Sequence, residues 1–126
     1  MDLSHIDLDK KHNVLLQNKL AFLAGVFEGE GSFGLWKGGV GTTKKYFRMQ
    51  VEMSDQDIIQ QFIDFFGIGK LGHRKPRKES YKDLYSWRIN GEAAVQCLYV
   101  MFPFLGERRQ EKFKGIMKIL KERHGS

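Results

Sequence analysis

Two glutamates, Glu28 and Glu30, stand two residues apart in segment 23–31, which reads Leu-Ala-Gly-Val-Phe-Glu-Gly-Glu-Gly. Carboxylate oxygens are the ligands that hard divalent cations such as Mg²⁺ prefer. Because residues two apart do not share a face of a helix, we expect only one of these acids to point into a site. If two copies of the helix pair about a two-fold axis, the Glu30 carboxylates converge and form a divalent-metal site. The alternative is a helix that frays at a glycine-rich turn and leaves two solvated acids.

Small residues recur in the same segment, where Ala24, Gly25 and Gly29 follow a spacing of roughly four. Glycine inside a helix costs about 1 kcal/mol relative to alanine, so these positions need a reason. A face of small residues lets two helix backbones approach closely and gain van der Waals contact. The pattern therefore favours pairing of this helix with another one.

A second set of candidate residues alternates along the expected strands. Arg, Lys and Gln side chains read base edges in the major groove of DNA, and Tyr and Lys bind phosphates. The residues with this parity are Trp36, Lys44, Tyr46, Arg48, Gln50, Lys70 and Arg74, and a basic loop with Lys75, Arg77, Lys78 and Lys82 would hold the DNA backbone. An ordinary solvated sheet face is the alternative. On the next strand Tyr85, Trp87 and Ile89 are the more apolar set, but Leu84 opposes them, so no readers are assigned there.

Hydrophobic periodicity and turn residues predict the elements that position these side chains. We expect helices over 13–29, 92–102 and 107–123, and strands over 32–37, 45–53, 69–75 and 84–89. Another helix is expected to begin after Ser54 as its N-cap and to end at Gly67, and Asn90 is expected to cap the helix that Pro103 ends. The order predicts an α+β fold in which two hairpins form one antiparallel four-stranded sheet with helices on one face.

The composition sets the class of protein. A chain of 126 residues with 29% charged residues predicts a single folded domain, 1–126, with residues 1–12 as a loose arm. The net charge of +6 favours a polyanionic partner. Because the apolar runs are short and Cys97 is the sole cysteine, we expect no membrane partner, no disulfide and an intracellular location.

Taken in this order, these features resemble the LAGLIDADG homing endonuclease family. Seven of the nine positions in segment 23–31 agree in kind with the family motif, and both acids are Glu where the founding pattern has Asp. Segments 53–59 and 66–70 resemble the start of the family's second helix and the turn into its third strand. Segment 102–105, followed by Arg108, Arg109 and Lys112, resembles the region after its third helix. The resemblance covers residues 19–120 and implies the αββαββα fold.

The resemblance implies a catalytic site. The matched metal-binding acid is Glu30, with Gly29 beside it, and Mg²⁺ is the expected ion, with Mn²⁺ or Ca²⁺ as other occupants. Arg108 matches a basic residue near the scissile phosphate, and Glu28 matches an acid that is usually structural. Polar and basic residues that some relatives carry align here with Met53 and Asp57, which leaves Gln50 or Gln56 to position water.

The resemblance also implies an activity and an assembly. The activity is site-specific hydrolysis of double-stranded DNA at a long near-palindromic target, in the service of intron homing and without a small-molecule substrate. A chain with one motif is expected to form a homodimer, and the interface residues are Leu20, Leu23, Ala24, Gly25, Phe27, Glu28 and Gly29. The compartment would be a chloroplast or mitochondrion, or the bacterial or phage-infected cytoplasm.

Two other functions fit the same residues. One is a non-cutting relative, either a DNA-binding regulator or an RNA splicing maturase on the same scaffold. It predicts binding without metal-dependent cleavage. The other is a protein-interaction module in which the glycine-rich helix serves only assembly, and it predicts no salt-dependent DNA affinity.

Overall fold

The computed structural model describes residues 14–39, 41, 44–79 and 81–125 of the chain. The N-terminal arm predicted for residues 1–12 lies outside the described residues. The elements follow in the order α1 (Val14–Glu30), β1 (Gly31–Lys37), β2 (Lys45–Met53), α2 (Gln56–Phe66), β3 (Gly72–Arg74), β4 (Leu84–Asn90), α3 (Gly91–Met101), the 3-10 turn η2 (Phe102–Phe104) and α4 (Glu107–Gly125).

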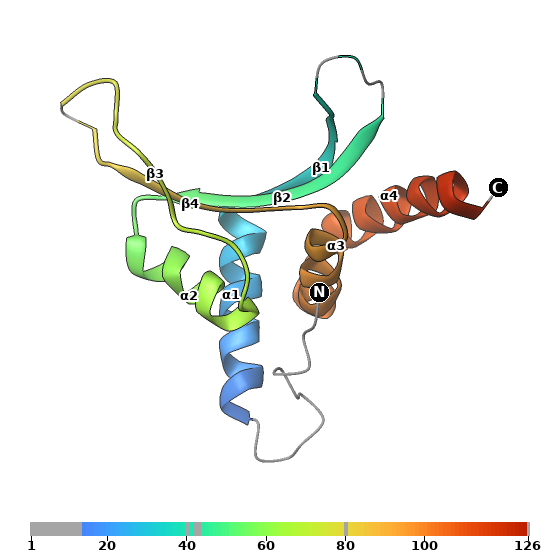
Figure 1. Ribbon diagram of the computed structural model, residues 1–126. Coiled ribbons are helices and arrows are strands. Elements are labelled where there is room, and N and C mark those ends of the chain that lie inside the picture. Colours follow the sequence, from blue (N-terminus) through green and yellow to red (C-terminus); the bar gives the residue numbers. More distant parts are fainter. Residues whose placement is uncertain (1–13, 40, 42–43, 80, 126) are drawn as a thin grey trace.

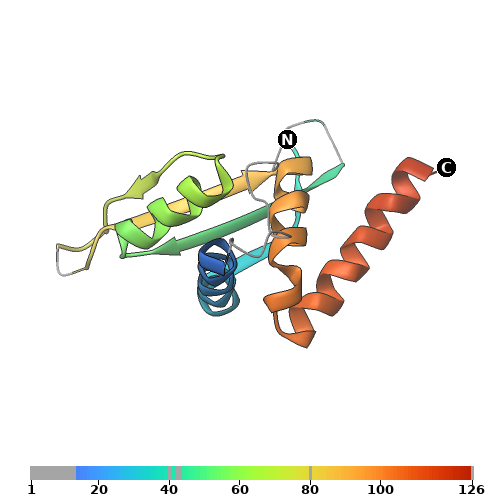
Figure 2. The ribbon, with the colours of Figure 1, turned by 90° about the horizontal axis from the view of Figure 1, so that it is seen from below.

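The four strands form one sheet in the order β1-β2-β4-β3, and every neighbouring pair is antiparallel. Helices α1, α2 and α3 lie against one face of this sheet, and the sheet curves so that its opposite face is concave (Figure 1). This confirms the predicted α+β fold. Figure 2 shows α1 under the β1 edge of the sheet, with one side turned away from α2 and α3. No helix in the described part of the chain is long and apolar enough to cross a bilayer.

The core lies between the sheet and the helices. On β2 the buried side chains are Phe47, Met49 and Val51, and the intervening residues are the polar ones, as the alternation predicted. Trp87 of β4 is fully buried and stacks between Phe62 and Phe66 of α2, with ring centroids 5.1 and 5.3 Å away. Apolar burial of this kind stabilises the fold by about 2 kcal/mol for each large side chain. The core therefore fixes which face of the sheet is left for solvent.

Two predictions concern the ends of α2: the one for its C-terminal end is confirmed, and the one for its N-terminal end is wrong. Gly67 ends the helix in a left-handed conformation with φ 68°, and its N–H donates to the carbonyl of Ile63 at 2.8 Å. This is the glycine stop that the sequence predicted. The predicted N-cap, Ser54, is wrong. Strand β2 continues through Met53, and Ser54 lies in the bend between the strand and the helix. Asp55 takes the N-cap position, without a capping bond from its side chain.

The third strand is shorter than predicted, since β3 covers 72–74 rather than 69–75. Gly69 has a φ of 96°, and a Cβ there would stand 2.7 Å from Nε1 of the Trp87 ring. That nitrogen donates a 3.0 Å hydrogen bond to the carbonyl of Ile68. At Gly69 the backbone therefore passes the edge of the Trp87 ring with a positive φ, which suits glycine. Because this is not the extended conformation of a strand, the pairing of β3 does not reach back to Gly69.

Asn90 occupies the predicted N-cap position of α3, but its side chain makes no capping bond. It accepts a hydrogen bond from Arg48 instead. Cys97 is buried on α3, and burial raises the pKa of its thiol to about 12. A thiol held in its protonated form is a poor nucleophile, so Cys97 is a core residue and not a reactive one.

Candidate nucleic-acid interface and catalytic site

The concave face of the sheet carries a row of polar side chains. Residues paired across antiparallel strands point to the same face. The register pairs Trp36 with Tyr46, Arg48 with Asn90 and Gln50 with Arg88. On β3, Gly72 pairs with Ser86 and Arg74 with Leu84. Because Phe47, Met49 and Trp87 are buried on the opposite face, all these polar residues lie on the side away from the helices. The predicted parity is therefore confirmed for Trp36, Tyr46, Arg48, Gln50 and Arg74, whereas Lys44 and Lys70 lie outside the strands and their predicted place in the alternation is wrong.

Arg48 is the most enclosed arginine of this face. Its Nε donates to Oδ1 of Asn90 at 3.0 Å, and Nη2 donates to the hydroxyl of Tyr46. Its guanidinium carbon stands 5.3 Å from the ring centroid of Trp36 and 5.2 Å from that of Tyr46. Stacking and hydrogen bonds thus hold one cation in a fixed place. Trp36 and Tyr46 therefore position Arg48.

Two more arginines stand further along the same row. Nε of Arg88 donates to Oε1 of Gln50 at 3.1 Å, and Nη2 of Arg74 donates to Oε1 of Glu52 at 2.8 Å. The sequence left β4 without readers, so Arg88 and its neighbour Ser86 were missed. The signal was the alternation of the polar residues Ser86, Arg88 and Asn90 with the apolar residues Trp87 and Ile89. The assignment was not made because Leu84, an apolar residue, falls among the polar positions of this alternation.

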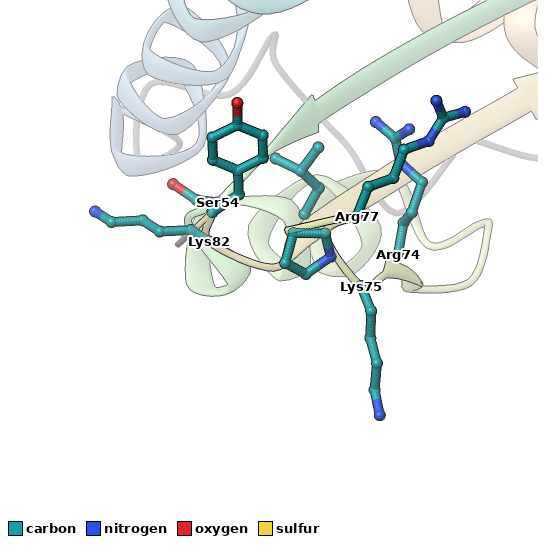
Figure 3. A pocket seen from close by; sticks show the side chains of 8 residues that line it. Ser54, Arg74, Lys75, Arg77 and Lys82 are labelled. Atoms are coloured by element: carbon teal, nitrogen blue, oxygen red, sulfur yellow. The ribbon is translucent and has the colours of Figure 1, made fainter. Parts of the chain in front are cut away.

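The loop between β3 and β4 encloses a hollow of about 840 Å³. Its lining residues are Ser54, Arg74, Lys75, Pro76, Arg77, Tyr81, Lys82 and Leu84. Figure 3 shows Arg74 and Arg77 pointing the same way, while Lys75 points in the opposite direction and Lys82 to the side. Lys70 lines a neighbouring hollow with Arg74 and Arg88. The predicted basic loop is thus continuous with the arginine row, although its lysines diverge.

The remaining predicted contacts of this interface lie at the ends of the hairpins. Lys44 is exposed before β2, and its carbonyl accepts a 3.0 Å hydrogen bond from the N–H of Gly38. Lys78 is exposed in the β3–β4 loop, with its Nζ 5.8 Å from the ring centroid of Tyr81. Both cations are accessible at the rim of the concave face. Their contact with DNA stays a prediction.

Glu30 is the last residue of α1, is exposed, and is followed at once by β1. The C-terminal end of a helix carries partial negative charge, and a carboxylate beside it forms a set of hard oxygen donors that suits a divalent cation. Within the described residues no three His, Cys, Asp or Glu side chains gather at one point where a metal could be held. The chemistry of Glu30 and the Gly29 carbonyl fits a hard divalent cation, but the described residues add no further acidic, His or Cys side chains to complete a site. Metal binding by these two groups stays a prediction.

Glu28 has a different environment, although it is only two residues away. Its Oε1 accepts a 2.8 Å hydrogen bond from the N–H of Gly106, and its Oε2 stands 2.9 Å from Nη1 of Arg109. A Cβ on Gly106 would lie 2.2 Å from Oε1, so the Glu28 carboxylate would have to move away if another residue stood there. Glu28 therefore fastens the end of α1 to the start of α4, which is a structural role.

A hollow of about 380 Å³ lies beside the start of β1. Its lining residues are Gly31, Ser32, Phe33, Arg108, Arg109 and Lys112. Lys112 donates from Nζ to the carbonyl of Phe33 at 2.6 Å and stands 4.8 Å from that ring's centroid. Arg109 is paired with Glu28, whereas Arg108 and Lys112 have no ion pair with a described residue and so supply positive charge to this hollow. This hollow can accept a phosphate one residue away from Glu30, and Ser32 is a lining residue that the sequence did not indicate.

The predicted dimer interface needs correction. Leu20, Leu23, Ala24 and Phe27 are at most 1% exposed within one protomer, so they belong to its core and cannot contact a partner. Because they repeat at i, i+3, i+4 and i+7, they form the stripe that α1 turns toward the sheet. Glu28 is half-buried and is committed to α4.

The exposed side of α1 carries the other predicted interface residues. Gly25 and Gly29 are exposed, and a Cβ added to either meets no heavy atom within 4 Å. Phe22 shares this stripe with 47% of its surface exposed, and the helix begins with exposed Val14 and Leu15. The sequence missed Phe22, although its spacing from Gly25 and Gly29 was a usable signal. Pairing through this stripe stays a prediction.

Known structures share this arrangement. No family model matches the sequence, and no curated protein does. The homing endonuclease I-CvuI, solved in complex with DNA targets, aligns with a TM-score of 0.68 at 19% identity over 86% of this chain and 69% of its own. The archaeal intron-encoded homing endonuclease I-Vdi141I, complexed with DNA, gives 0.61 at 16% over 84% and 70%. The LAGLIDADG homing endonuclease I-GzeII, with its DNA target, gives 0.61 at 15% over 82% and 36%. This chain therefore has the fold of the LAGLIDADG homing endonucleases.

Proposed function

We propose that this protein is a site-specific double-strand DNA endonuclease that acts as a homodimer with Mg²⁺. The observation that carries the proposal is the continuity between Glu30 and the sheet. The exposed carboxylate ends α1, and the next residue begins a strand of the sheet whose concave face carries Arg48, Arg88 and Arg74. A candidate hydrolytic group and a candidate DNA-reading surface thus belong to one rigid unit. The structural neighbours that are described as DNA complexes support the same assignment.

The sheet suits the major groove for physical reasons. The groove is about 12 Å wide and admits a two-stranded β-ribbon, and it displays a donor and acceptor pattern that differs for each base pair. The arginines of the concave face are held by neighbouring side chains, so less side-chain entropy is lost when they bind. The net charge of +6 favours approach to a polyanion.

The catalytic chemistry follows from the residues around Glu30. Glu30 and the Gly29 carbonyl would hold the divalent cation, which when bound stabilises charge on the phosphodiester. Arg108 and Lys112 would neutralise the phosphate in the neighbouring hollow. Gln50 and Gln56 are the candidates for positioning water, and the carbonyl oxygen of Gln50 is already engaged by Arg88.

Two protomers are required because two strands must be cut. Pairing through Phe22, Gly25 and Gly29 would bring two Glu30 carboxylates together, one for each strand. A domain of this length has a diameter of roughly 36 Å, about one turn of duplex, so a dimer spans about two turns of a near-palindromic target. We propose intron homing as the biological role, in an organelle or in the bacterial or phage-infected cytoplasm.

The test is cleavage of a randomised duplex library by the purified protein, with Mg²⁺ and with EDTA. We expect one family of near-palindromic sequences of about 20 base pairs to be cut on both strands with Mg²⁺ and left intact with EDTA. Selective binding without cleavage would instead identify a non-cutting regulator. Preference for structured RNA over duplex DNA would identify a splicing maturase. Absence of any salt-dependent DNA affinity would leave a protein-interaction module.

A further inference from the structure

The arginines of the concave face differ in which of their nitrogens are occupied. Arg48 uses both Nε and Nη2, for Asn90 and Tyr46. Arg74 uses Nη2 in an ion pair with the Glu52 carboxylate. Arg88 uses only Nε in its hydrogen bond to a described residue, and that bond goes to the uncharged amide of Gln50. Arg88 is therefore the arginine of this row whose charge is uncompensated and whose two terminal amino groups both remain for a ligand.

The hydrogen bond between Arg88 and Gln50 also determines which donor and acceptor groups Gln50 offers to a ligand. The carbonyl oxygen of Gln50 accepts from Arg88 at 3.1 Å, which uses one of its two lone pairs and leaves both N–H groups of the amide nitrogen outside that bond. The two side chains together then present mostly N–H donors. In the major groove guanine displays two acceptors, N7 and O6, whereas adenine displays one acceptor and one donor. A surface made mainly of donors is complementary to guanine.

The position of the pair supports contact with a base. Arg88 is exposed on β4 and lies directly opposite Gln50 of β2, on the side of the sheet away from the helices. These are the two central strands of the sheet, so the pair lies at the middle of the concave face and not at its rim. The Nε bond aims the guanidinium in one direction, which suits the bidentate geometry that arginine forms with guanine.

We propose that Arg88, aimed by Gln50, is the guanine-reading residue of this sheet, and that Arg74, compensated by Glu52, contributes little to that choice. The proposal rests on the proposed function, because it takes duplex DNA as the ligand of the concave face. It adds to that function one residue that reads the target and the base that this residue recognises. Comparing the target sequences selected by the wild type and by the variants identifies both.

The experiment is selection of bound duplexes from a randomised library with Ca²⁺, followed by sequencing, for the full-length protein and three variants. The wild type is expected to select a guanine at one position of each half-site. Arg88→Lys keeps the charge but loses the planar pair of donors, so the preference for guanine at that position should fall about tenfold or more. The other selected positions should stay the same.

Two further variants separate this reading role from general attraction to DNA. Gln50→Glu gives Arg88 the same kind of carboxylate partner that Glu52 gives Arg74, and it should weaken the guanine preference even though the arginine is intact. Arg74→Lys makes the same substitution at the arginine that Glu52 compensates, and it should lower the guanine preference at that position less than Arg88→Lys does. Circular dichroism and thermal melting of each variant check that the fold is unchanged.

The outcomes distinguish the inference from the function on which it rests. If the wild type selects a motif and Arg88→Lys selects the same guanine equally well while overall affinity falls, Arg88 is a phosphate contact and the inference is wrong. A loss of guanine preference in Arg74→Lys, but not in Arg88→Lys, would also overturn it. If the wild type enriches no duplex sequence at all, the proposed function itself fails, and the inference fails with it.

Discussion

At the scale of single residues, Glu28 and Glu30 show how environment separates two acids of the same type. Glu28 accepts a hydrogen bond from the Gly106 N–H and forms an ion pair with Arg109, whereas Glu30 is exposed at the helix end. The two-residue spacing indicated this division, because it forbids a shared helix face. The partners of Glu28 could not be predicted, since Gly106 lies 78 residues further along the chain. Contacts across that distance leave no local periodicity.

We predict that Glu28→Ala lowers the free energy of unfolding by about 2 kcal/mol, because the Gly106 N–H loses its acceptor and the Arg109 guanidinium loses its ion-pair partner in a partly buried place. Urea unfolding followed by circular dichroism measures this change. The control is Glu111→Ala, which breaks an exposed ion pair with Lys114 and should cost at most about 0.5 kcal/mol. Equal losses in the two variants would show that Glu28 is not a fastening residue.

Residue parity on the strands was predictable to the extent that alternation was clean. On β2 the buried and polar faces are those expected, because nothing interrupts the pattern. On β4 the half-buried Leu84 falls on the polar face beside the hairpin, and this concealed Arg88. Arg88 was therefore not assigned because Leu84 stands at the end of a hairpin, where an apolar residue is tolerated outside the core.

At the scale of elements, α1 carries the exposed stripe through which we propose that two copies pair. Its apolar residues occur on nearly all sides, so periodicity predicted the helix but not which stripe faces inward. The packed structure settles this, with Leu20, Leu23, Ala24 and Phe27 against the sheet and Phe22, Gly25 and Gly29 outside. The open space around a Cβ at Gly25 shows that the fold of one protomer does not require glycine there. We propose close pairing with a second copy of the helix as the reason for glycine at this position.

We therefore predict that Gly25→Gln leaves the protomer folded, or stabilises it by up to about 1 kcal/mol, yet dissociates the dimer. Sedimentation velocity and thermal melting measure the two effects separately. Gly115→Gln on α4 is the matched control, because that glycine is also exposed with nothing within 4 Å of an added Cβ. It should change melting in the same direction without changing the mass of the particle. An intact Gly25→Gln dimer would move the interface away from this stripe.

At the scale of the whole molecule, the proposed function joins the concave sheet face to the end of α1. The element order, the sheet and the segment around Glu30 were predictable from the sequence, because they depend on local pattern and on the family resemblance. Loop hollows, the arginine partners and the short β3 were not, because they depend on how Trp87 and the hairpins pack. The proposed function requires a second copy, since one chain supplies one Glu30 for two DNA strands.

The most direct measurement uses a supercoiled plasmid that carries the target recovered from the library. Wild-type protomers are mixed with differently tagged Glu30→Gln protomers, and the mixed dimers are purified before Mg²⁺ is added. Wild-type dimers should give linear DNA, mixed dimers should give nicked circles, and Glu30→Gln dimers should bind the plasmid and leave it supercoiled. Linear DNA from Glu30→Gln dimers at the wild-type rate would contradict the role of Glu30 and the paired site built on it.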